Sequence, residues 1–289
     1  MVTIMKISVS SYSFGSYADS DKLGVIGIMD KAREMGFEGI ELVEHPEFDD
    51  PAMLERIKEH SHNIGLPIIA LDVGADFTKN DCSSTDEEIA RVKKLVDLAS
   101  YLDIPLMRHD VCYGNFTKKF GTGFEDVLPV ITKACREVAD YAEKRGVRTM
   151  FENHGYFIQD AYRVEKLINT VAHPNFGYLI DLGNFMCSDE DATAATGLLA
   201  RYAVHAHAKD FHFKSGTLEN PGEGWFPTRS GNYLRGAIIG HGDAKIGQSV
   251  RRLKESGYDG YVTIEFEGLE DNLKGIALGL ENLKKYISD

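Results

Sequence analysis

Apolar residues recur along this chain with two alternating periods. Short apolar or alternating runs rich in β-branched residues predict strands, and segments with apolar residues every three or four positions predict amphipathic helices. The predicted strands cover residues 4–10, 39–43, 67–73, 104–108, 148–152, 177–181, 203–209 and 261–266. The predicted helices cover residues 21–35, 51–63, 85–101, 124–145, 161–171, 188–201, 246–256 and 271–287.

This alternation of eight strands with eight helices predicts a closed parallel (β/α)8 barrel, the TIM-barrel fold. No linker or low-complexity segment interrupts the order, so residues 1–289 are expected to form a single domain. An open doubly wound sheet is the alternative, but no Gly-x-Gly-x-x-Gly motif follows a strand. The connection 211–242 is rich in glycine and too long for an ordinary βα loop, and we expect it to cover part of the barrel.

Composition narrows the class of protein further. The chain is 43% hydrophobic and 27% charged, as is typical of soluble globular proteins. A net charge of -13 makes nucleic acid and anionic membranes unfavourable partners. Residues 1–6 do not resemble a signal peptide, and no apolar run is long enough to span a membrane. The cysteines are scattered without a Cys-x-x-Cys pair, which suits reduced thiols in a cytoplasmic protein.

The seventh predicted strand has two different faces. His205, His207 and Lys209 share one face, whereas small apolar residues occupy the other. A lone His-x-His pair is most simply read as two hydrogen-bonded core residues. A metal site is favoured only if other strands carry suitable ligands at the same end.

Acidic residues do end the neighbouring predicted strands. Glu152 ends the fifth strand, Asp181 ends the sixth, and Glu265 lies next to the end of the eighth. In a barrel these strand ends converge on one mouth, together with His207 of the seventh strand. Three carboxylates this close repel one another unless a cation lies between them. The set predicts a divalent metal site, with Mn2+ as the first expectation and Mg2+, Co2+ or Zn2+ as alternatives.

At these residues the chain resembles the xylose isomerase-like TIM-barrel superfamily, of the sugar phosphate isomerase/epimerase type. The matching motifs are SSYSF at 10–14, GFEGIE at 36–41, FENHG at 151–155, Ile-Asp at 180–181, HAHAKD at 205–210, GHGD at 240–243 and GYDGY at 257–261. The resemblance implies that Glu152, Asp181, His207 and Glu265 hold the metal. It also implies that Glu152 and Glu265 remove and return a proton around a metal-stabilised enediolate.

Two departures from the ketose 3-epimerases of this superfamily indicate different substrate handling. Asn184 stands where those epimerases have a second histidine, and Phe213 stands where they have an arginine. His154 is similar to the substrate-contacting histidine of dehydratase-like members. The alternative function is therefore a metal-dependent lyase or dehydratase acting on a keto-sugar, a keto-cyclitol or an oxidised (C-)glycoside, and a non-catalytic sugar-binding barrel is a third.

Five residues are predicted to contact the carbohydrate substrate: His154, Lys209, His45, Asn184 and His109. Lys209 has the alternative of pairing with Asp210, and His45 that of a solvated loop residue. The superfamily's DNA-cleaving endonucleases need ligands that are missing from residues 234–242, so that role is rejected. The resemblance further suggests a homo-oligomer, dimer or tetramer, and a second small subunit if the chain is a C-glycoside lyase.

Overall fold

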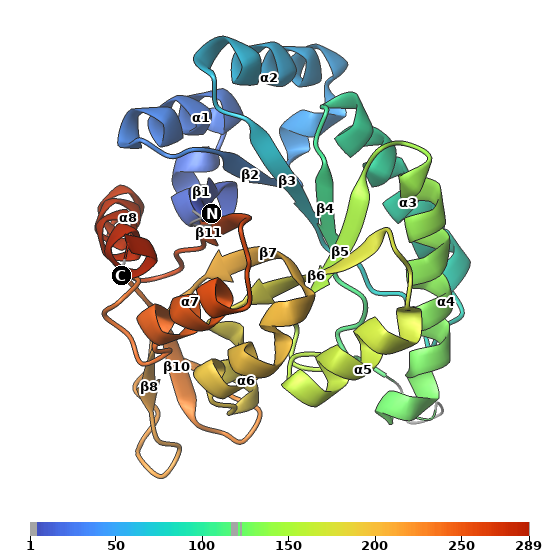
Figure 1. Ribbon diagram of the computed structural model, residues 1–289, viewed down its shortest axis with the longest axis vertical. Coiled ribbons are helices and arrows are strands. Elements are labelled where there is room, and N and C mark those ends of the chain that lie inside the picture. Colours follow the sequence, from blue (N-terminus) through green and yellow to red (C-terminus); the bar gives the residue numbers. More distant parts are fainter. Residues whose placement is uncertain (1–4, 117–120, 122, 289) are drawn as a thin grey trace.

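The computed structural model describes residues 5–116, 121 and 123–288, within which eight parallel strands form a closed barrel (Figure 1). In their order around the barrel, the strands are β1 (Lys6–Ser10), β11 (Tyr261–Ile264), β7 (Ala203–Ala208), β6 (Phe176–Asp181), β5 (Arg148–Glu152), β4 (Leu106–His109), β3 (Ile68–Val73) and β2 (Ile40–Val43). β1 closes the barrel by pairing with both β11 and β2. The predicted (β/α)8 barrel is confirmed, although residue 4, where the first strand was expected to begin, lies outside the described residues.

A ring of helices surrounds the barrel, as Figure 1 shows. These are α1 (Gly24–Met35), α2 (Pro51–Ile64), α3 (Thr85–Tyr101), α4 (Phe124–Glu143), α5 (Ala161–Val171), α6 (Ala192–Leu199), α7 (Ile246–Glu255) and α8 (Asn272–Ser288). Among the described residues, four short 3-10 helices accompany them: η1 (Ser11–Ala18), η2 (Pro46–Asp49), η3 (Asn184–Ser188) and η4 (Ala200–Tyr202). Within the part of the chain that the structure describes, no helix combines the length and apolar character that crossing a membrane requires.

The helix expected over 188–201 is shorter than predicted. It begins only at Ala192, because the Asp191 side chain caps it by accepting a hydrogen bond from the Ala194 backbone N–H. Residues before and after it form η3 and η4 instead. By contrast, α1 ends at Met35 as predicted, and Gly36, which follows it, adopts the left-handed conformation at φ 87°.

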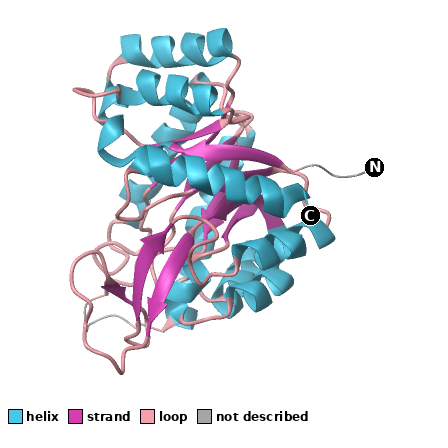
Figure 2. Ribbon diagram, turned by 90° about the vertical axis from the view of Figure 1, so that its left-hand side faces the viewer, coloured by secondary structure: helices cyan, strands magenta, loops and turns pink. Residues whose placement is uncertain are grey.

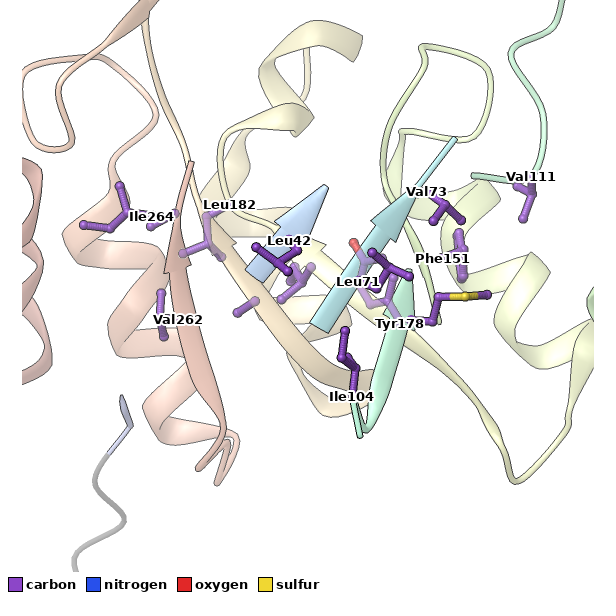
Figure 3. Close-up of a cluster of buried hydrophobic side chains, with 14 of the residues drawn as sticks. Leu42, Leu71, Val73, Ile104, Val111, Phe151, Tyr178, Leu182, Val262 and Ile264 are labelled. Carbon is purple, nitrogen blue, oxygen red and sulfur yellow. The ribbon is translucent and has the colours of Figure 1, made fainter. Parts of the chain in front are cut away.

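The main hydrophobic core lies between the barrel and its helices (Figure 3). Leu42, Leu71 and Phe151 belong to this layer and are fully buried. Because side chains alternate along a strand, the residues next to them point into the barrel. Glu41 and Asp72, adjacent to Leu42 and Leu71, are therefore buried inside the barrel among polar neighbours.

The long connection between β7 and α7 forms a small antiparallel sheet that the sequence did not predict. Its strands are β8 (Asp210–Lys214), β10 (Tyr233–Ala237) and β9 (Phe226–Pro227), in that order, and Figure 2 shows the sheet beside the barrel. The β7 strand ends at Ala208, one residue earlier than expected. The Asp210 carboxylate links the two ends of the connection, because it accepts hydrogen bonds from the backbone N–H groups of Phe211, Gly240, Gly242 and Ala244.

This sheet contacts the loops at the carboxyl ends of β5 and β6. The Tyr156 hydroxyl, after β5, donates to the Pro227 carbonyl over 2.9 Å. Asp189, after β6, accepts hydrogen bonds from the Thr228 hydroxyl and from the Ser230 backbone, each over 2.7 Å. The connection therefore lies on the side of the barrel that carries the predicted site.

Candidate metal centre

The four predicted metal ligands lie together at the carboxyl ends of β5, β6, β7 and β11. Sheet register explains this, because Asp181 is paired with His207, and the Glu265 N–H donates to the Ala208 carbonyl beside it. One ligand atom from each of Glu152, Asp181, His207 and Glu265 lies within 4.8 Å of the others. His207 Nδ1 is 3.7 Å from Glu152 Oε1, 3.9 Å from Asp181 Oδ2 and 3.6 Å from Glu265 Oε2.

The chemistry of these four residues fits a divalent cation. All four are at most 5% exposed, and Asp181 Oδ2 and His207 Nδ1 are buried atoms without a hydrogen-bond partner. Burial raises the pKa of Asp181, the attraction of Lys209 opposes this, and the carboxylates of Glu152 and Glu265 add to it, which together bring that pKa to about 7. Such mutual repulsion between carboxylates is relieved when a cation binds between them, and oxygen ligands with one imidazole suit Mn2+ or Mg2+.

Both candidate acid/base glutamates are held ionised by nearby cations. Burial alone would raise the pKa of Glu152, but the Arg108 guanidinium, 2.9 Å from its Oε2, holds that pKa well below the usual range. Asn184 donates to Glu152 Oε1 over 2.9 Å. Burial would also raise the pKa of Glu265, but Lys209 and His207 outweigh this effect and lower that pKa to about 2. At neutral pH both glutamates are therefore carboxylates that can accept a proton.

Lys209 points into the cluster rather than toward Asp210. Its Nζ contacts Glu265 Oε2 directly and lies 3.7 Å from Asp181 Oδ2 and 3.8 Å from Glu267 Oε2. Glu267 in turn accepts a hydrogen bond from the Tyr12 hydroxyl over 3.2 Å. The alternative pairing of Lys209 with Asp210 is not formed, because Asp210 is engaged with backbone amides.

His154 forms a second acid/base pair beside the cluster. Its Nδ1 is 2.9 Å from Asp110 Oδ1, and its side chain remains 40% exposed. Burial lowers the pKa of His154, but Asp110 outweighs this effect and raises it above the ordinary value. Asp110 also accepts a hydrogen bond from the Tyr113 hydroxyl over 2.7 Å and contacts Arg108 Nη1 at 3.2 Å. This network joins His154 to Glu152 through Arg108.

Two of the predicted substrate contacts, His109 and His45, are not brought into this cluster. His109 is fully buried against Phe77 and Phe176, and its Nδ1 lies 2.9 Å from the Asp110 carbonyl oxygen. It points outward because its neighbour Arg108 points inward. His45 Nδ1 accepts the Glu47 N–H over 3.2 Å at the start of η2, which gives that ring a local capping role.

The structure adds Arg108, Asp110, Asp72 and Glu41 to the surroundings of the predicted ligands. Arg108 Nε lies 3.5 Å from Asp72 Oδ2, and that oxygen lies 3.8 Å from His207 Nε2. A signal for Asp72 was present in the sequence, because it is a charged residue between Leu71 and Val73 within a predicted strand, and Arg108 is a charged residue that ends the apolar run of the fourth predicted strand. Both residues lie on strands other than the fifth to eighth, which carry all four predicted ligands.

A closed parallel barrel with this cluster at its mouth defines the class of protein. The family model described as xylose isomerase-like TIM barrel matches residues 29–286, so the chain belongs to that family. Among curated proteins, no sequence relative matches.

Solved structures of similar fold cover nearly the whole chain. A D-allulose 3-epimerase from Methylomonas sp. has a TM-score of 0.76 and 15% identity, covering 98% of each chain. The probable 3-DHS dehydratase AsbF from Bacillus anthracis has a TM-score of 0.72 and 17% identity, covering 99% of each chain. A barrel from Mycobacterium smegmatis in complex with magnesium has a TM-score of 0.72 and 17% identity, with 98% of this chain and 97% of that one covered. At these identities the likeness concerns the fold alone.

Proposed function

We propose that this chain is a divalent-metal-dependent isomerase or epimerase of a sugar or sugar phosphate. The observation that carries this proposal is the convergence of three buried carboxylates on the unpartnered Nδ1 of His207. Glu152, Asp181, His207 and Glu265 would hold the ion, with Mn2+ as the first expectation and Mg2+, Co2+ or Zn2+ as alternatives. The fold shared with a D-allulose 3-epimerase and with a magnesium-binding barrel supports it.

The reaction is proton transfer next to a carbonyl group. When bound, the metal would polarise the substrate carbonyl and a neighbouring hydroxyl, which lowers the cost of removing the proton between them. Glu152 is ionised by its contact with Arg108, so it can accept that proton while the C–H electron pair forms a carbon–carbon double bond and the carbonyl π pair moves onto the oxygen. A proton returns to carbon from the contacting pair of Lys209 and Glu265, and exchange with solvent then resets both groups.

Other residues would orient the substrate. Lys209 can donate a hydrogen bond to a substrate oxygen, and the partly exposed ring of His154 can reach a hydroxyl at the mouth. Asn184 orients Glu152 by donating its amide to Oε1, while Arg108 contacts Oε2.

A lyase or dehydratase acting on a keto-sugar, keto-cyclitol or oxidised glycoside is the second candidate. The pairing of His154 with Asp110 favours it, because Asp110 stabilises an imidazolium that could protonate a leaving oxygen. In that reaction Glu152 would remove the same proton. The resulting electron pair would then form a double bond as the neighbouring C–O bond breaks. His154 would supply the proton with which the oxygen leaves as water or alcohol.

The two candidates are separated by incubating the Mn2+-loaded protein in D2O with ketoses, ketose phosphates, keto-cyclitols and oxidised glycosides. An isomerase or epimerase incorporates one deuterium next to the carbonyl and otherwise preserves substrate mass. A lyase releases water or the aglycone. Glu152→Gln should abolish either reaction, whereas Glu88→Gln, a control at a buried glutamate away from the cluster, should retain it. If no substrate class exchanges carbon-bound hydrogen with solvent or loses mass, the proposal is overturned.

A further inference from the structure

Glu41 contacts both histidines of β7 from across the barrel. It lies on β2, which is separated from β7 by β1 and β11, and its side chain is fully buried. Its Oε2 lies 2.8 Å from His205 Nε2 and 3.0 Å from His207 Nε2. A carboxylate can only accept hydrogen bonds, so both imidazoles must present an N–H at Nε2 to use these contacts.

This contact determines which nitrogen of His207 is available as a ligand. In a neutral imidazole, a proton at Nε2 leaves the lone pair at Nδ1. Nδ1 is the atom that faces Glu152, Asp181 and Glu265 at 3.6–3.9 Å. The bond to Glu41 therefore sets both the rotation of the ring and the tautomer that a metal ligand requires.

His205 contacts Glu41 and is itself contacted by Thr263. The His205 ring meets the His207 ring edge-on, with centroids 5.6 Å apart and planes at 81°. His205 Nε2 is also 3.0 Å from Thr263 Oγ1, which lies 2.7 Å from Ser8 Oγ. This buried chain of polar contacts explains why His205 occupies the same strand face as His207 without joining the four-ligand cluster.

We propose that Glu41 is a positioning residue that presents Nδ1 of His207 to the divalent metal. The inference rests on the proposed metal-dependent function and extends it to a residue outside the ligand set. Carboxylates that accept the second N–H of a ligating histidine orient the ring and increase its basicity. Their replacement typically lowers metal affinity by about 10- to 100-fold.

The test compares Mn2+ binding to the wild-type chain and to Glu41→Gln, which retains shape and loses the charge. Electron paramagnetic resonance titration should show a dissociation constant about 10- to 100-fold higher for Glu41→Gln. Electron spin echo envelope modulation should show a weakened histidine nitrogen coupling to the bound Mn2+. Glu88→Gln, a buried carboxylate that contacts Lys79 and Arg91, is the matched control and should bind Mn2+ as the wild type does.

Each outcome separates this inference from the proposed function. Wild-type affinity and nitrogen coupling in Glu41→Gln would overturn the role of Glu41 while leaving the metal site intact. Two ions per wild-type chain and one in Glu41→Gln would make Glu41 a ligand and also overturn it. A wild-type chain that binds no divalent ion would overturn both proposals.

A measurement on the wild type covers the case in which Glu41→Gln does not fold. Nitrogen-15 resonances of the Zn2+-loaded protein should show metal at Nδ1 of His207 and a downfield-shifted proton at Nε2, hydrogen-bonded to Glu41. Metal at Nε2, or no such proton, would refute the inference.

Discussion

Metal binding should stabilise the folded chain, and Asp181→Asn should abolish that stabilisation. In the cluster, Asp181 Oδ2 and His207 Nδ1 are buried without hydrogen-bond partners. The Asp181 carboxylate is crowded by those of Glu152 and Glu265, which raise its pKa together with burial. A divalent ion would satisfy the two atoms and offset the repulsion, and it would bind the folded chain in preference to the unfolded one.

The size of the effect follows from these contacts and from mass action. A buried polar atom without a partner costs about 1–3 kcal/mol, so two such atoms give an available gain of about 2–6 kcal/mol. A ligand at 100 times its dissociation constant stabilises by about 2.7 kcal/mol, and at 1,000 times by about 4.1 kcal/mol. For a chain of this size, roughly 2 °C accompanies each kcal/mol. The midpoint of thermal unfolding should therefore rise by about 5–8 °C.

The assay is differential scanning calorimetry of chelator-treated protein titrated with Mn2+. Asn at position 181 can still accept the Gly183 and Asn184 backbone hydrogen bonds, which are 2.7 and 2.8 Å long. Metal-free Asp181→Asn should thus unfold at or above the wild-type temperature, because one repelling charge is gone, and Mn2+ should leave it unchanged. Glu88→Gln should keep the full shift. An equal shift in Asp181→Asn would place the stabilising metal elsewhere, and no shift in the wild type would refute a metal site at this cluster.

Two further predictions concern residues outside the four ligands. Burial lowers the pKa of His109 from 6.5 to about 4. The part of the folding stability that depends on a neutral imidazole is therefore complete above pH 6.5 and is lost as the pH falls toward 4. This loss amounts to about 3 kcal/mol. His109→Leu should remove it from the pH dependence of the free energy of unfolding in urea. An unchanged pH dependence in this variant would contradict a buried, neutral His109. Asp189→Ala should speed amide hydrogen exchange in residues 226–237, because it deletes bonds to Thr228, Ser230 and Asn232. Unaltered exchange there would show that other contacts hold the small sheet.

The barrel and its four-ligand cluster could be predicted because both depend on local pattern. Each strand carries its own apolar run, and each of Glu152, Asp181 and Glu265 ends such a run. In a parallel barrel all strands place their carboxyl ends at one mouth, so no knowledge of strand order was needed to bring these residues together. The small sheet of β8, β9 and β10 escaped prediction because its strands are short and lie within a glycine-rich segment.

The alternation of side chains along β4 explains why His109 lies outside the cluster. The fourth strand was expected over 104–108, and its short apolar run does not establish which residues face inward. A change of one residue exchanges the two faces of a strand. In the structure Arg108 takes the inward position and reaches Glu152, which leaves His109 among the aromatic side chains outside the barrel.

The contacts that support His207 depend on distance across the barrel, which local sequence does not encode. Glu41 reaches His207 although 166 residues separate them in the chain and two strands separate β2 from β7. The His-x-His pattern on β7 is by itself most typical of two core residues, and it is also compatible with metal ligands. Only the depth of each ring inside the barrel distinguishes these cases: His205 lies one pleat deeper, where Glu41 and Thr263 contact it, and His207 lies level with the three acidic strand ends. One strand face thus carries both a candidate ligand and part of the network that orients it.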